Sequence, residues 1–176
     1  KLESGAPLPE LELQLCLMLG SPLTVIRGYG HPDVERVYLR ARDLCQELGD
    51  TPHLVAALGG VAGFFMLRGG YREGAPLCEQ MLSASLRFED PYAEAAARLG
   101  LGVLQYFHGD LAAARAHFEA IIARYDRAQH FLHVQTYKQD PCVAARCFLG
   151  DALTLSGFPD QAMQCAEEGR RLAESL

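Results

Sequence analysis

The chain has 176 residues, which is the size of one domain or of a short array of repeats. Ala and Leu contribute 24 and 27 of these residues, whereas Ile and Val together contribute 11 and Trp is absent. Because Ala and Leu favour helices and β-branched residues favour sheets, this composition predicts an all-α protein. The apolar fraction of 49% excludes a disordered chain, and the net charge of −6 argues against nucleic acid or an anionic membrane as the partner.

The longest uncharged apolar run covers residues 54–67, which is too short to cross a bilayer, so no membrane span is expected. The six cysteines are scattered and form no CxxC pair. Reduced thiols in a cytoplasmic protein are therefore expected. The sequence starts without Met and stops inside a helical pattern, so we expect it to be part of a longer polypeptide.

The first segment, residues 8–20, is ambiguous because its leucines alternate as they would in a strand: Leu11, Leu13, Leu15, Leu17 and Leu19. The Glu, Gln, Met and Leu residues of this segment are good helix formers, and the repeats described next require a helix, so a helix is expected. The following element is clear. Apolar residues keep a helical spacing from Val34 to Leu48, which predicts a helix over residues 33–48.

The rest of the chain repeats itself, with the same features in the same order. Alanine pairs occur at 56–57, 96–97 and 144–145. Each pair is followed by a turn glycine, namely Gly69, Gly109 and Gly157. Both sets are spaced 40 and then 48 residues apart, and a proline (Pro52, Pro91 or Pro141) opens the segment before each pair. Self-similarity at such a period indicates a repeat array.

Each repeat contains two predicted helices separated by its turn glycine. These helices cover residues 52–68, 72–88, 91–107, 111–125, 141–156 and 159–175. With the first unit they give about four helix pairs in a single domain, in units spanning roughly 8–50, 51–90, 91–139 and 140–176. One pair cannot bury its own apolar face, whereas stacked pairs share a continuous core, so the sequence predicts an α–α superhelix.

Small residues recur on the first helix of each pair, because Ala62, Gly102 and Gly150 each lie seven positions before a turn glycine. A residue with little or no side chain lets the partner helix approach closely. We expect bulkier residues of the second helices, such as Met81 and Phe118, to fill the remaining space.

This pattern resembles the tetratricopeptide repeat, which has Leu-Gly on the first helix, Gly at the turn, and an aromatic residue between small ones on the second helix. The third unit matches it best, with Leu101, Gly102, Gly109, Ala114, Phe118 and Ile121. Other units depart from it, since Cys78 and Ala166 stand where an aromatic residue is usual. The first unit keeps only Val34, Tyr38 and Ala41. The period of 40 also exceeds the usual 34.

Shorter phrases are similar to arrays that follow an AAA-type ATPase module in bacterial adenylate/guanylate cyclase proteins and in LuxR-type regulators. These phrases cover residues 27–29, 32–35, 44–52, 139–141 and 157–162. The resemblance implies a sensor or scaffold part of a signalling protein. The cyclase, ATPase or DNA-binding chemistry would then lie outside these residues.

No constellation of residues indicates catalysis. The glycine-rich segment 59–63 has no following Lys-Ser or Lys-Thr and no preceding strand, so close helix packing explains it better than a nucleotide loop. His130, His133, Cys142 and Cys147 are the only grouping of metal-type ligands. Because Cys142 and Cys147 differ by about 140° around a helix, we expect no metal. The lack of nucleotide-binding and catalytic motifs predicts no cofactor and no enzymatic activity.

The family resemblance implies that the first helices of successive pairs line a concave groove. The equivalent positions here are Met66, Leu99, Val103, Tyr106, Cys147, Asp151 and Thr154. This mixed and rather apolar set favours an apolar helix or extended segment, from another protein or from the same full-length chain. The alternative, that these residues only pack against neighbouring units, stays open.

Residues 127–139 are an extension that interrupts the repeat, with Phe131, Tyr137 and Gln139 as candidate contact residues. Inserts in repeat arrays usually map to one face, often the binding face, but an ordered spacer is the alternative. The main functional prediction is a protein-interaction or regulatory module that can also self-associate through its end helices. A small-ligand sensor, with its effector in the groove or beneath the extension, is the second.

Overall fold

The computed structural model describes residues 8–28, 30–48, 53–137 and 139–176, and within these ranges every regular element is helical. The all-α fold class is therefore confirmed. The chain divides into two compact units, residues 1–89 and 90–176. Pro52, expected in the first turn of the helix over residues 52–68, and Tyr29 lie outside the described residues.

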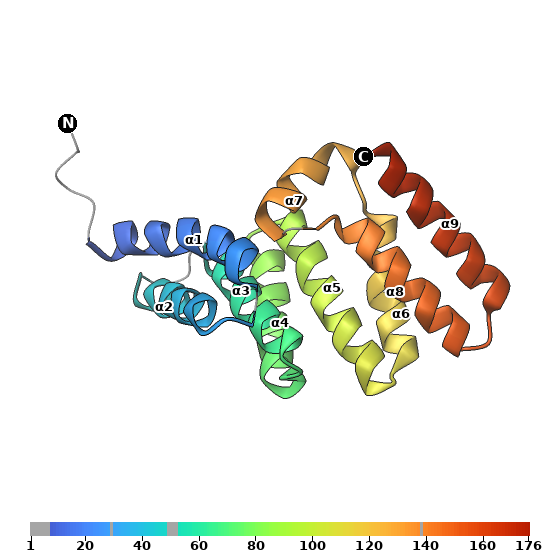
Figure 1. Ribbon diagram of the computed structural model, residues 1–176, viewed down its shortest axis with the longest axis horizontal. Helices are drawn as coiled ribbons and strands as arrows, with labels where there is room; N and C mark the ends of the chain where they lie inside the picture. The colour runs from blue at the N-terminus through green and yellow to red at the C-terminus, as the bar shows by residue number, and fades with distance from the viewer. Residues whose placement is uncertain (1–7, 29, 49–52, 138) are drawn as a thin grey trace. The chain divides into compact units, whose positions relative to one another are not determined.

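In the first unit, α1 (Leu8–Arg27), α2 (Pro32–Leu48), α3 (His53–Leu67) and α4 (Tyr71–Arg87) follow one another, and each packs against the next (Figure 1). The helix expected over residues 8–20 is confirmed, and it continues through Pro22. Pro22 removes one backbone donor without ending the helix. In the same turn the Thr24 hydroxyl donates to the carbonyl of Gly20 at 2.7 Å.

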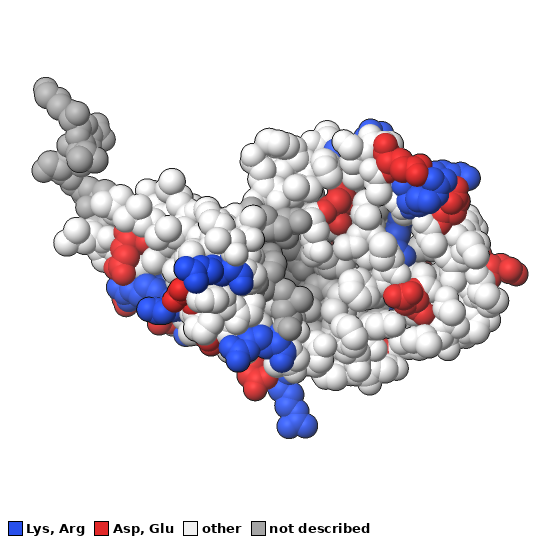
Figure 2. All heavy atoms as spheres, viewed as in Figure 1, with Lys and Arg blue, Asp and Glu red and all other residues white. Residues whose placement is uncertain are grey.

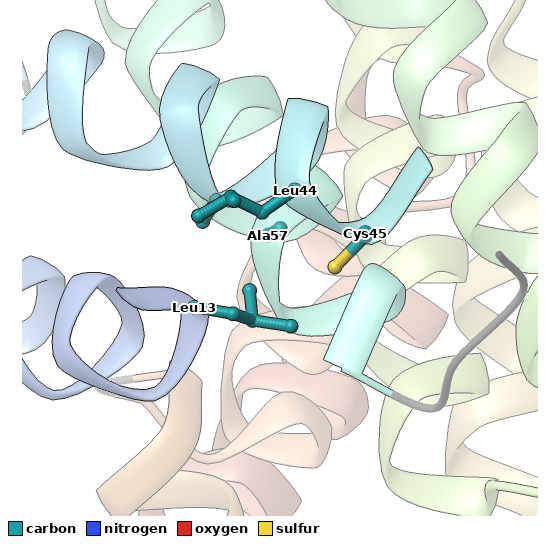
Figure 3. Close-up of a cluster of buried hydrophobic side chains, with 5 residues drawn as sticks. Leu13, Leu44, Cys45 and Ala57 are labelled. Carbon is teal, nitrogen blue, oxygen red and sulfur yellow. The ribbon is translucent and has the colours of Figure 1, made fainter. Parts of the chain in front are cut away.

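Side chains from three helices meet in the core of this unit. Figure 3 shows Leu13 of α1 pointing toward Leu44 and Cys45 of α2 and Ala57 of α3, all at most 2% exposed. The strand-like alternation of leucines in α1 has a helical explanation here. Leu13 is buried, whereas Leu11 and Leu15 are exposed on the other side of the helix. α1 is thus apolar on two sides rather than extended.

In the second unit, α5 (Pro91–His108), α6 (Leu111–Ala123), α8 (Pro141–Leu155) and α9 (Pro159–Ser175) form two helix pairs (Figure 1). α6 packs on α8, and α5 contacts both α8 and the extension. The extension folds as a short 3-10 helix, η1 (Arg127–Gln129), followed by α7 (His130–Tyr137). The described helices thus give the four predicted pairs plus one inserted helix.

Glycines with a positive φ end the first helix of every pair. The φ values are 79° at Gly28, 76° at Gly69, 85° at Gly109 and 84° at Gly157, a conformation that residues with a side chain rarely adopt. The last three match the predicted turn glycines. Gly28 adds a turn that the sequence reasoning did not recognise, 41 residues before Gly69, and so extends the repeat into the first unit.

Rings pack directly onto helix glycines where paired helices touch. A Cβ atom at Gly102 would lie 2.5 Å from a ring carbon of Phe118, which is fully buried. In the first unit the ring of Tyr38 on α2 lies against both Gly20 of α1 and Gly60 of α3, where Cβ atoms would lie 2.7 and 2.2 Å from it. These approaches confirm the expected role of Gly102 and assign the same role to two glycines at other positions.

We predict that Gly102→Ala lowers the free energy of unfolding by about 1–2 kcal/mol, because overpacking against the Phe118 ring outweighs the higher helix propensity of Ala. Gly150 occupies the equivalent position in the next pair, but a Cβ there would meet only a carbonyl oxygen at 3.6 Å. Gly150→Ala should therefore stabilise by about 0.5–1 kcal/mol. Urea denaturation measures both variants, and equal effects would contradict the ring–glycine explanation.

Candidate functional site

Asp140 is the buried polar centre of the second unit, and it joins the extension to the last helix pair. One carboxylate oxygen accepts hydrogen bonds from the backbone N–H groups of Cys142 and Val143, both at 2.9 Å, which caps α8. The other oxygen accepts the Tyr125 hydroxyl at 2.7 Å and lies 2.9 Å from Nδ1 of His130. Asp140 is thus the N-cap of α8, and it has two further side-chain partners.

The charge on Asp140 is stabilised although only 8% of the residue is exposed. Burial by itself raises the pKa of this carboxyl, but the hydrogen bonds from His130, the two backbone N–H groups and Tyr125 together lower the pKa below its ordinary value. Burial and the neighbouring carboxylate raise the pKa of Tyr125, so its hydroxyl stays a donor. Asp140 therefore acts as an acceptor with all four donors in place.

His133 of α7 is a second buried polar group, 4% exposed, with its ring 5.0 Å from that of Tyr92 on α5. Its Nδ1 atom has no hydrogen-bond partner in the described part of the chain. Burial lowers its pKa, opposed by Asp140 and Asp90 and assisted by His130. The neutral form is therefore favoured, and its contribution to stability is present above the ordinary pKa and is lost as the pH falls below it.

A small cleft of about 40 Å³ opens where η1 and α7 cover α5 and α6. Its polar lining residues include Glu94, Arg98, Arg124, Gln129 and His133. Glu94 accepts hydrogen bonds from the Arg98 guanidinium at 2.7 Å and from the Arg124 guanidinium. The two cations share this one carboxylate, and the lining also includes Asp126, whose carboxylate caps η1.

The groove residues of the sequence analysis fall into three environments. Cys147, Asp151 and Thr154 lie exposed along α8. Leu99 and Val103 of α5 are only 5% and 9% exposed. Tyr106 is half-buried, with its ring 5.9 Å from that of Phe148. Met66 belongs to the first unit and is partly exposed there. That these residues line a binding groove stays a prediction.

The face over α5 and α8 carries few charged atoms in Figure 2, whereas both signs of charge gather at the C-terminal end of α9. The exposed stripe of α8 is therefore a largely neutral surface with an isolated acid at Asp151. Such a surface suits an apolar partner with a cationic group more than a strongly charged partner.

The candidate contacts of the extension differ in accessibility. Phe131 is 66% exposed and Gln139 is exposed. The side chain of Tyr137 lies outside the described residues. The structure also assigns the neighbouring His130 and His133 to the inner side of the extension, a role that the sequence reasoning missed. The only available signal was their position just before the recognisable Asp140–Pro141 cap.

The grouping of metal-type ligands does not come together as one site. His130 lies beside Asp140, Cys142 is 2% exposed with its pKa raised by burial, and Cys147 lies on the exposed side of α8. No three His, Cys, Asp or Glu residues of the described ranges are arranged to hold a metal ion. None of the described helices is long and apolar enough to span a membrane.

No family model matches the chain, and no curated protein matches it in sequence. Solved structures with a similar fold include BtubC (BKLC) from P. vanneervenii, with a TM-score of 0.76, 19% identity, and coverage of 98% of this chain and 67% of that one. A putative kinesin light chain of Podosopora anserina with nearly identical TPR-like repeats has a TM-score of 0.57 and 15% identity, with 97% and 98% covered. A variant of that protein matches equally, with a TM-score of 0.57 and 16% identity over 96% and 97% of the two chains. The fold is therefore that of the TPR-like α–α superhelix.

We predict that Asp140→Ala lowers the free energy of unfolding by about 2–4 kcal/mol, because the helix cap and the partners of two side chains are lost together. Asp110→Ala is the matched control, since Asp110 caps α6 through one hydrogen bond at an exposed site. It should cost only about 1 kcal/mol. Guanidinium denaturation measures the free energy of unfolding of both variants. Equal losses would show that Asp140 contributes no more than its helix cap.

Proposed function

We propose that this chain is a protein-interaction module whose binding face is the exposed side of α8, supported from within by α5. Its partner would be an apolar helix or extended segment, from another protein or from the same full-length polypeptide. The TPR-like fold of the similar structures supports a binding role without catalysis. The neutral surface over α5 and α8 supports a largely apolar partner.

The observation that carries the proposal is the exposed stripe of α8. Cys147, Asp151 and Thr154 are separated by four and three residues, so they fall within about 60° on one side of the helix. Leu99, Val103 and Tyr106 repeat this spacing on α5, 48 residues earlier. The rings of Tyr106 and Phe148 join the two helices at 5.9 Å. The α8 stripe is accessible to a partner, and the α5 stripe supports it from within.

The wider context is also a proposal. The phrases shared with cyclase-associated and LuxR-type arrays support a bacterial signalling protein, in which this module acts as scaffold or sensor. One phrase, residues 139–141, contains the Asp140 cap that holds the extension in place. The six cysteines are free thiols, which supports a cytoplasmic location.

Exposed Cys147 provides a direct test of the binding face. In a Cys16→Ser background every remaining cysteine except Cys147 is buried, so a fluorophore can be attached at Cys147 alone. Helical peptides selected from a phage-displayed random library should shift its emission, and Asp151→Lys should weaken their binding at least about tenfold by removing a polar contact.

Asp160→Lys makes the same charge change at an exposed site on α9 and serves as the control. It should leave peptide affinity within about twofold, as expected for a residue outside the interface. Selected peptides that bind without changing the emission at Cys147, and that tolerate Asp151→Lys, would show that the binding face lies elsewhere.

The cleft beneath the extension favours a second candidate function, a sensor of a small anion. Arg98 and Arg124 could receive a carboxylate or phosphate there, next to the unpartnered Nδ1 of His133. If so, millimolar acetate or inorganic phosphate should raise the melting temperature of the chain, and Arg98→Gln should abolish the rise. Identical melting of the two proteins with and without these anions would exclude this function.

A further inference from the structure

The outer side of α1 is an uninterrupted apolar stripe. Seven large apolar side chains of this helix are 47% to 82% exposed, namely Leu8, Leu11, Leu15, Met18, Leu19, Val25 and Ile26. At 100° per residue they all fall within an arc of about 120°, and Pro22 lies in the same arc. The buried residues of α1 (Leu13, Gly20 and Thr24) lie on the opposite side.

The stripe has the spacing of a helix-packing seam. Leu8, Leu11, Leu15, Met18, Pro22 and Val25 are separated by alternating steps of three and four residues. No charged side chain of α1 falls within the arc. Glu12 lies at its edge, and both oxygens of that carboxylate accept hydrogen bonds from Arg40 of α2 at 2.8 Å. The seam is therefore neutral, and its nearest charge is already paired within the unit.

The outer side of α9, the last helix, is built in the opposite way. Glu167 pairs with Arg170 and Arg171, and Arg170 also pairs with Glu174. Figure 2 shows acidic and basic side chains gathered at the C-terminal end of this helix. A polar outer face is what closes a helical array against solvent. α9 has such a face, whereas α1 does not.

This contrast restricts what can cover the stripe. Head-to-tail stacking would place the neutral stripe of one copy against the ion pairs of α9 in another, which would desolvate charges without compensation. Elsewhere in the described ranges, exposed large apolar residues lie singly or in short groups, such as Phe131 with Leu132. The matching apolar face is the stripe itself. A surface that matches itself produces a closed two-fold pair rather than a filament.

We propose that two copies of this chain associate through the α1 stripe and bury it as a helix–helix interface. Two stripes would bury on the order of 1,000 Å² in total, which is the area at which specific interfaces begin. Met18 lies near the middle of the stripe, so it contacts the partner whether the two α1 helices run parallel or antiparallel. The interface uses neither the α8 stripe nor the cleft, so it is independent of the proposed binding face.

Sedimentation velocity of the 176-residue chain over a range of micromolar concentrations tests this proposal. The mass should rise with concentration from 19.3 kDa to twice that value. Met18→Glu should weaken the association at least about 100-fold, because a charge would be buried twice, once from each copy. Ile26→Lys should do the same from near the end of the stripe.

Met163→Glu on α9 is the matched control, because Met163 and Met18 are both 73% exposed. It should leave the association unchanged, and circular dichroism should show the same helix content in all variants. A wild-type chain that stays at 19.3 kDa throughout, or a dimer that survives Met18→Glu and Ile26→Lys, would overturn the proposal.

Discussion

The Gly102–Phe118 contact sets how closely the helices of a pair can approach. Phe118 is completely buried, and its ring occupies the space that a methyl group at position 102 would need. Tyr38 requires a glycine on two neighbouring helices, because its ring lies against Gly20 on one and Gly60 on the other. A ring thus acts as a spacer of fixed thickness, and glycine is the residue that leaves room for it.

Other features of the second unit follow from that spacing. Phe148 of α8 stacks on Phe118, with ring centres 5.9 Å apart and planes inclined by 17°. The Phe118 ring that sets the distance between α5 and α6 therefore also contacts the first helix of the next pair. Tyr106 meets the same Phe148 from α5. The last pair has no ring of this kind. Its close approach lies instead at Gly169, where a Cβ would be 3.1 Å from Cβ of Arg146, so Ala166 can be exposed without leaving a cavity.

The inserted residues 127–139 lie outside the repeat pattern, in which each helix is positioned by packing on its neighbours. The insert therefore needs contacts of its own to hold it in place. Asp140 supplies the anchor at the first residue where the repeat resumes. Its carboxylate both starts α8 and holds Tyr125 and His130, one residue from each side of the 3-10 helix. The result is a cleft whose walls come from the repeat and whose cover comes from the insert.

The sequence predicts those parts of the fold that depend on spacing along one chain. The alanine pairs, the turn glycines and the Asp140–Pro141 cap each act within a few residues of their own position, so their periodicity reveals the helices and their pairing. The contacts between distant residues are not encoded in that way. Glu94 and Arg98 form a recognisable i,i+4 pair, but Arg124 joins them only because α6 folds back beside α5. Leu99 and Val103 occupy groove positions by repeat number, yet the neighbouring elements bury them.

The alternating leucines of α1 show that one sequence pattern can arise from two different structures, a strand or a helix that is apolar on two sides. In a strand, a residue and its second neighbour share a face, whereas in a helix they lie about 200° apart. Leucines at every second position therefore place apolar surface on two opposite sides of the helix, and one side is packed on α2 and α3. The packed side includes Leu13 with Cys16 and Leu17 in the core, Gly20, Thr24 and the Glu12–Arg40 pair. Association through the outer side requires α1 to be folded in place, so association at the stripe and order in the first helix pair are thermodynamically linked.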